Sequence, residues 1–195
     1  MRVSRLVIAA ALVATTALVG CRSTKEVLQI GEAAETNPGP CPRAFALYDA
    51  SRIVEFRGEQ ERFANVGFTG EFNKVRSLCR YYGANPIEGD LELDIEFGRG
   101  PAAAGQSTAT YEYFVAVTRK NIGVINKKTF PIQVTFPAGS DRVRVTERVD
   151  KIVIPRAKEG TSGENFEIIV GFELTEAQRV FNAEGKRFRV SAGQN

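Results

Sequence analysis

The 195-residue sequence contains no histidine and no tryptophan, and its single methionine is the first residue. Without histidine, the chain has neither a Ser-His-Asp nor a Cys-His nucleophile arrangement, and it has no imidazole ligand for a metal ion. Cysteine is scarce as well, with three residues in the whole chain. These absences exclude several large classes of hydrolase and metalloenzyme, and we expect neither a cofactor nor a bound metal ion.

The first 20 residues have the organisation of a secretory signal peptide. Arg2 and Arg5 provide a positive start, the uncharged stretch Leu6–Val19 follows, and a small residue precedes Cys21. A transmembrane helix needs about 20 apolar residues to cross the hydrocarbon core, and this stretch is shorter. Removal of residues 1–20 leaves 24 cations against 23 carboxylates, a net charge of +1. That charge is too small to favour a nucleic-acid partner.

The leader ends in Leu18-Val19-Gly20-Cys21. This sequence resembles the lipobox of bacterial lipoproteins, in which the cysteine accepts a diacylglyceryl group and becomes the N-terminal residue after cleavage. The mature part is also similar to small lipoproteins of Gram-negative cell envelopes. In that family a residue other than Asp after the cysteine favours the outer membrane, and here it is Arg22. The resemblance implies a lipid anchor at Cys21 in the outer membrane, facing the periplasm; the alternative is an ordinary signal peptide followed by an unmodified cysteine.

Two cysteines remain once Cys21 is assigned to the lipid, namely Cys41 and Cys79. Exported proteins fold in an oxidising environment, so we predict a disulfide bond between this pair. A redox-active pair is the alternative, but the two residues lack Cys-x-x-Cys spacing and there is no histidine to lower a thiol pKa.

Turn-forming residues mark where the folded domain begins. After the signal peptide, residues 21–40 are predicted to form the lipidated N-terminus and a flexible tether that closes with Asn37-Pro38-Gly39-Pro40. Residues 41–190 are predicted to form one domain, and residues 191–195 a frayed tail.

Alternation of apolar and polar residues dominates the predicted domain, which is typical of half-buried strands. We therefore predict a mainly β fold, an antiparallel immunoglobulin-like β-sandwich of about seven or eight strands, with a small closed barrel as the alternative. Pro131 has no N–H for a strand ladder and indicates an edge position. Thr175 and Gln178 form a capping-box pattern, which predicts one short helix that ends before Gly185. The alternation is clear in six stretches, 66–72, 90–97, 111–117, 130–136, 142–149 with an extension over 152–154, and 166–174.

Four carboxylates alternate along one predicted strand, and three arginines alternate in the same way along another. We call the first set the acidic ladder; it consists of Asp90, Glu92, Asp94 and Glu96, and the arginines are Arg142, Arg144 and Arg148. Paired carboxylates can act as general acid and base, but charged side chains on the solvated face of a strand are common. Because opposite charges on neighbouring strands attract, we expect the two strands to be sheet neighbours or to lie close together across one surface.

A second set of residues surrounds a predicted turn at residues 121–123 and is our candidate partner-binding surface. It combines cations with apolar side chains, a composition that recognition loops of sandwiches often have. The alternative is a solvated turn whose apolar side chains pack into the end of the sandwich. The set is Arg119, Lys120, Ile122, Val124, Ile125, Lys127 and Lys128.

These observations favour a non-catalytic binding or assembly module of the cell envelope. Its expected partners are the membrane, through the lipid anchor, and a protein of the envelope; we expect no nucleic acid and no small-molecule substrate. One alternative is a module that binds the cell wall or anionic lipids through its basic residues. The other is an envelope hydrolase that uses carboxylates such as Glu92 and Asp94.

Overall fold

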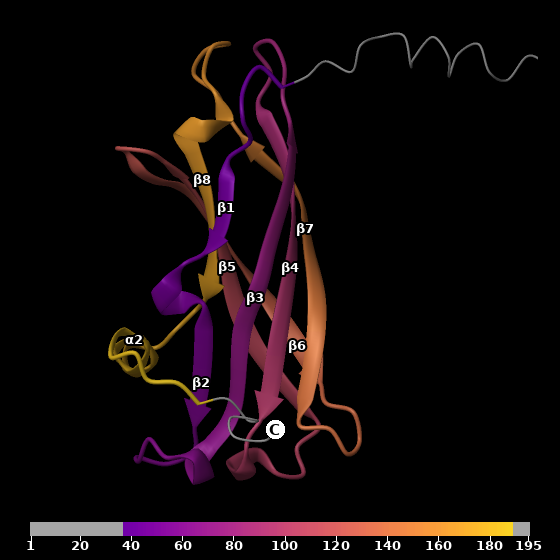
Figure 1. The fold of residues 1–195 in the computed structure, drawn as a ribbon, viewed down its shortest axis with the longest axis vertical. Helices are drawn as coiled ribbons and strands as arrows, with labels where there is room; N and C mark the ends of the chain where they lie inside the picture. The colour runs from indigo at the N-terminus through magenta and orange to yellow at the C-terminus, as the bar shows by residue number, and fades with distance from the viewer. Residues whose placement is uncertain (1–36, 189–195) are drawn as a thin grey trace, which may run out of the picture. The chain divides into compact units, whose positions relative to one another are not determined.

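The computed structural model describes residues 37–188. The predicted signal peptide, Cys21, most of the predicted tether and the predicted tail at 191–195 lie outside the described residues. The described part contains eight strands and one α-helix, which Figure 1 labels. Their bounds are β1 Arg43–Ala46, β2 Arg52–Phe56, β3 Val66–Arg80, β4 Ile87–Arg99, β5 Thr108–Arg119, β6 Gly123–Thr135, β7 Arg142–Ile154, β8 Phe166–Phe172 and α2 Glu176–Ala183.

The strands form two four-stranded sheets, ordered β1-β8-β5-β6 and β2-β3-β4-β7. The mainly β sandwich is confirmed, and two separate sheets replace the closed barrel that was the alternative. All pairs are antiparallel except β1 with β8, where Arg43–Ala46 runs parallel to Glu167–Val170. The edge position of Pro131 is also confirmed, since β6 ends its sheet and Pro131 lies opposite Glu112 of β5.

Alternation along β4 shows why the sequence folds this way. Leu91, Leu93, Ile95 and Phe97 are at most 2% exposed, while the residues between them are more exposed. The observed strands are longer than the predicted ones, and residues 152–154 do extend β7. The two short strands β1 and β2 carry too few alternating positions to be found by periodicity alone.

Aromatic rings fill the space between the sheets. The ring centroids of Phe72 on β3 and Phe172 on β8 are 4.7 Å apart, and those of Phe97 on β4 and Tyr111 on β5 are also 4.7 Å apart. These are contact distances for aromatic pairs, which add to the free energy gained from burial of their area. The two sheets are therefore packed directly on each other.

The predicted disulfide bond between Cys41 and Cys79 is confirmed. It sits within a group of hydrogen bonds, because the Tyr81 hydroxyl donates to the Pro40 carbonyl (2.9 Å) and accepts from the Gly163 N–H (3.0 Å). The Asn37 carboxamide accepts from the Tyr81 N–H (2.8 Å) and donates to the Cys79 carbonyl (3.2 Å). From Asn37 onward, the predicted tether is thus fixed to the domain.

The predicted helix is present, with the capping box formed by Thr175 and Gln178. Gly185 follows it with a φ of 73°, a left-handed conformation that glycine adopts without steric cost. Phe181 is 2% exposed and packs with residues of β2 and β3. The Asn182 carboxamide donates to the carbonyls of Asp49 (2.7 Å) and Arg52 (2.8 Å), which attaches α2 beside β2 (Figure 1).

Replacing both Cys41 and Cys79 by Ala should lower the free energy of unfolding by about 4 kcal/mol, because the bond closes a long loop in the unfolded chain. The bridged residues are 38 positions apart. Urea titration of the oxidised protein and the variant measures the difference. Tyr81→Phe is the control for local hydrogen bonds; a loss no larger in the cysteine variant than in this control would contradict the prediction.

Candidate functional site

The candidate partner-binding residues lie on the hairpin of β5 and β6. We call the set Arg119, Lys120, Ile122, Val124, Ile125, Lys127 and Lys128 the hairpin surface. The predicted turn is present, with the Ile122 N–H donating to the Arg119 carbonyl (3.0 Å) and positive φ at Asn121 and Gly123. The connection between the two strands is shorter than the predicted one, which ran from residue 118 to residue 129, because β5 ends at Arg119 and β6 begins at Gly123. The last four members of the set are therefore strand residues.

Three apolar side chains are exposed at the hairpin tip. The exposed fractions are 64% for Ile122, 64% for Val124 and 41% for Ile125. Ile125 is the extra residue of a β-bulge, since Asn126 lies opposite Val117 and Val124 lies opposite Thr118. The alternative in which these side chains pack into the end of the sandwich does not match this exposure.

The two lysines of β6 lie on opposite faces of their sheet, as alternation requires. The Lys127 Nζ is 2.7 Å from a Glu173 carboxylate oxygen and 4.5 Å from the centroid of the Phe114 ring. Lys128 instead lines a groove on the inner side, together with Val115 and Val117 of β5. The four cations of the hairpin surface therefore do not form one continuous positive face.

This groove lies between the free edges of the two sheets, at β6 and β7. Its volume is about 350 Å³, within the usual range for ligand-binding clefts. About half of its wall is apolar, and charged or amide side chains form the other half. We call it the edge groove; its lining is Val115, Val117, Asn126, Lys128, Phe130, Arg148, Val149, Asp150, Lys151, Ile152 and Val153.

The acidic ladder faces arginines, as predicted, because β4 and β7 are paired neighbours. Arg148 lies opposite Glu92 with a nitrogen–oxygen distance of 3.3 Å, and Arg144 lies opposite Glu96 at 3.0 Å. Arg142 is more distant from Glu96, at 3.7 Å. Opposite charges in direct register offset the repulsion between successive carboxylates of β4.

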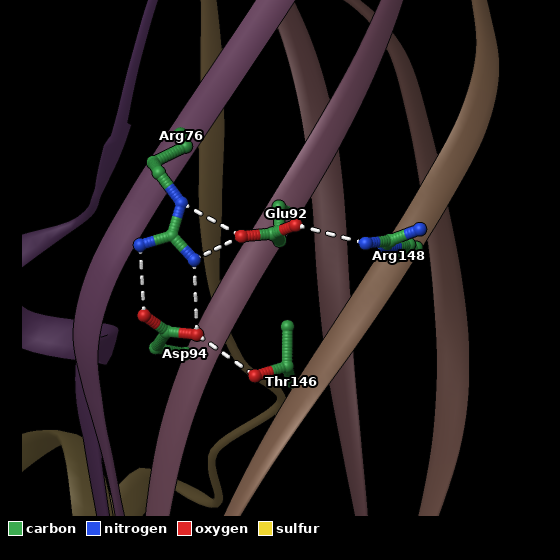
Figure 2. A network of polar contacts seen from close by, with 5 residues as sticks. All are labelled: Arg76, Glu92, Asp94, Thr146 and Arg148. Carbon is green, nitrogen blue, oxygen red and sulfur yellow. Dashed lines mark hydrogen bonds and ion pairs between the residues drawn. The ribbon is translucent and has the colours of Figure 1, made fainter.

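Figure 2 shows a further arginine, Arg76 of β3, on the other side of the ladder. Its Nε donates to Glu92 (2.8 Å) and its Nη1 donates to Asp94 (2.9 Å), while the Thr146 hydroxyl of β7 also donates to Asp94 (3.0 Å). Glu92 is therefore held between arginines on two strands. Arg76 was not among the residues predicted from the sequence, although its spacing from Lys74 repeats that of the ladder.

These contacts favour the ionised form of Asp94. Hydrogen bonds from Arg76 and from Thr146 hold the pKa of Asp94 below its ordinary value. A general acid needs the opposite change, a pKa raised toward neutral pH by burial or by a neighbouring negative charge. Among residues 37–188, no group of three or more Cys, Asp or Glu side chains is arranged to hold a metal ion.

The chain matches no protein-family model, no curated protein and no solved structure. In the part of the chain from Asn37 to Phe188, no helix is long and apolar enough to span a membrane.

Arg76→Met should raise the pKa of Asp94 toward the ordinary aspartate value of 3.8. Because the lowered pKa belongs to the folded state, the Arg76 contact stabilises the fold above the ordinary pKa and is lost as pH falls through the lowered one. The variant should thus lose more stability at pH 7 than at pH 2. NMR titration of the Asp94 carboxyl carbon measures the pKa directly.

Arg144→Met is the matched control, because Arg144 contacts Glu96 rather than Asp94. If the Asp94 pKa rises equally in both variants, the rise comes from the loss of any nearby positive charge. That result would contradict a specific effect of the Arg76 hydrogen bonds.

Proposed function

We propose that the protein is a non-catalytic binding or assembly module of the bacterial cell envelope, anchored to the outer membrane by lipid on Cys21. The exposed apolar hairpin tip, which adjoins a partly apolar groove at open strand edges, carries the binding part of this proposal. The anchor rests on the sequence Leu18-Val19-Gly20-Cys21, which lies outside the described residues. Two acyl chains are enough for stable membrane attachment.

The charges around the groove define the chemistry of the partner. Lys128, Arg148 and Lys151 line the groove with one carboxylate, Asp150. An acidic partner would complement this surface, and apolar side chains of the partner would cover the groove wall. Because β6 is an edge strand, an extended segment can also add to its free backbone groups. We therefore infer an extended, acidic and partly apolar segment of an envelope protein as the partner.

The same contacts make the two alternatives weaker. A carboxylate-dependent hydrolase needs one protonated carboxyl, whereas Asp94 is held ionised and Glu92 lies between two arginines. An anionic lipid or cell-wall polymer would be best met by one continuous positive face. Lys127 is paired with Glu173 and turned away from Lys128, so the hairpin offers only part of such a face.

The anchor is tested by Cys21→Ser. The variant should accumulate as the uncleaved precursor or appear in the soluble fraction, because it lacks the thiol that accepts the lipid. Membrane fractionation with mass spectrometry of the N-terminal peptide measures this, and Ser23→Ala serves as the neighbouring control. An unmodified thiol at Cys21 in the mature protein would contradict the anchor.

The binding surface is tested by photocrosslinking in intact cells from a photoreactive residue at Ile122. We expect one discrete protein adduct, and mass spectrometry should place the link in an acidic segment of that protein. Leu78 is the matched control position, since it is 78% exposed and lies outside the hairpin surface. Replacing Lys120 and Lys128 together by Glu should remove the adduct, whereas Lys158→Glu should leave it.

Three results would overturn this partner assignment. The first is no adduct from Ile122, and the second is the same set of adducts from Ile122 and Leu78. The third is an adduct that contains only lipid or polysaccharide, which would favour the anionic-surface alternative.

A further inference from the structure

A second site lies on another part of the domain, around Arg52 at the start of β2. The Arg52 residue is only 7% exposed. Its Nε and Nη2 are buried and have no hydrogen-bond partner. Buried charged donors without partners are rare because they lose their hydration without compensation. Their presence points to a group that binds there.

Arg52 lines a small cavity beside α2, with a volume of about 40 Å³. A cavity of at least about 10–15 Å³ can hold one water molecule, so this one is large enough for a carboxylate group but small for a bulky ligand. None of its lining residues belongs to the hairpin surface or the edge groove. The site therefore does not depend on the proposed function.

The charge around the cavity favours an anion. Its lining includes four cations, Arg52, Arg142, Lys186 and Arg187, and two carboxylates, Glu71 and Glu96. Glu96 already lies within ion-pair distance of Arg142 and Arg144, at 3.7 and 3.0 Å. Lys186 is likewise within ion-pair distance of Glu61 and Glu184, at 2.6 and 2.5 Å. Arg52 and Arg187 are thus the lining cations that would face a bound anion.

Neighbouring residues hold the Arg52 guanidinium in place. Its central carbon is 5.1 Å from the centroid of the Tyr48 ring, a cation–π contact. Arg187 donates to the Tyr48 hydroxyl (3.3 Å), which brings a second guanidinium to the same tyrosine. The adjacent Nε and Nη2 of an arginine match the two oxygens of a carboxylate or a phosphate in a bidentate contact.

We propose that Arg52, supported by Tyr48 and Arg187, forms a binding site for a carboxylate group. The limited cavity volume favours the planar carboxylate over the larger tetrahedral phosphate. The carboxylate belongs either to a small organic acid or to the end of a peptide, and both present the same two oxygens to the guanidinium.

The direct test is NMR titration of the full-length protein, following the Arg52 Nε–H resonance. Acetate is the first probe, an acetylated dipeptide with a free C-terminus is the second, and chloride and phosphate are compared at the same ionic strength. We expect a saturable shift with acetate and none with chloride. Tighter binding of the dipeptide would identify a peptide end as the source, and tighter binding of acetate a small acid.

Variants locate the binding group. Arg52→Lys should weaken acetate binding by about tenfold or more, since the ammonium cannot make the bidentate contact. Arg80→Met is the matched control, because Arg80 is an exposed arginine that does not line the cavity. It should bind acetate as the unmodified protein does. If Arg52→Lys does not fold, Arg187→Met provides the comparison and should also weaken binding.

The proposal is wrong if acetate produces no saturable shift, or if chloride produces the same shift. It is also wrong if Arg52→Lys retains full affinity for acetate, and tighter binding of phosphate than of either carboxylate would overturn the assigned ligand class.

Discussion

The alternation of β4 is the constraint on which the two sheets depend. This strand pairs with β3 on one side and β7 on the other, and its apolar residues point into the aromatic core. A slip of one residue would exchange its two faces and bury Asp90, Glu92, Asp94 and Glu96. Such a burial of four carboxylates is prohibitively unfavourable. The arginines of the flanking strands act in the same direction, since they meet their carboxylates only in the observed register.

The edge groove and the exposed hairpin tip both result from strand edges that no other strand covers. β6 and β7 each end a sheet, and the space between them is wide enough to leave the edge groove rather than a closed core. The hairpin continues past the point where Arg119 pairs with Phe166, the first residue of β8, so its tip has no strand beside it on that side. Unpaired strand edges and exposed apolar side chains can pair with other chains, so an isolated domain usually covers or shortens them.

Features that one or two segments of the sequence specify could be predicted, and features that need the assembled sheets could not. Charge complementarity was enough to predict that β4 and β7 are neighbours, and the capping residues were enough to predict α2. Arg76 was missed because a bulge between Phe72 and Lys74 interrupts the alternation of β3. Arg52 was missed because β2 is short and begins with a buried arginine, which no periodic pattern indicates. The edge groove needs both sheets and therefore has no signature in any single segment.

The disulfide also determines how the domain carries mechanical load. β1 is four residues long and is held by one parallel pairing, so alone it would detach easily if the chain ahead of it were pulled. Cys41 lies just before β1 and is covalently joined to Cys79 near the end of β3, an interior strand of 15 residues. Tension applied ahead of Cys41 therefore passes through a covalent bond into β3, and the backbone hydrogen bonds between β3 and β4 share it.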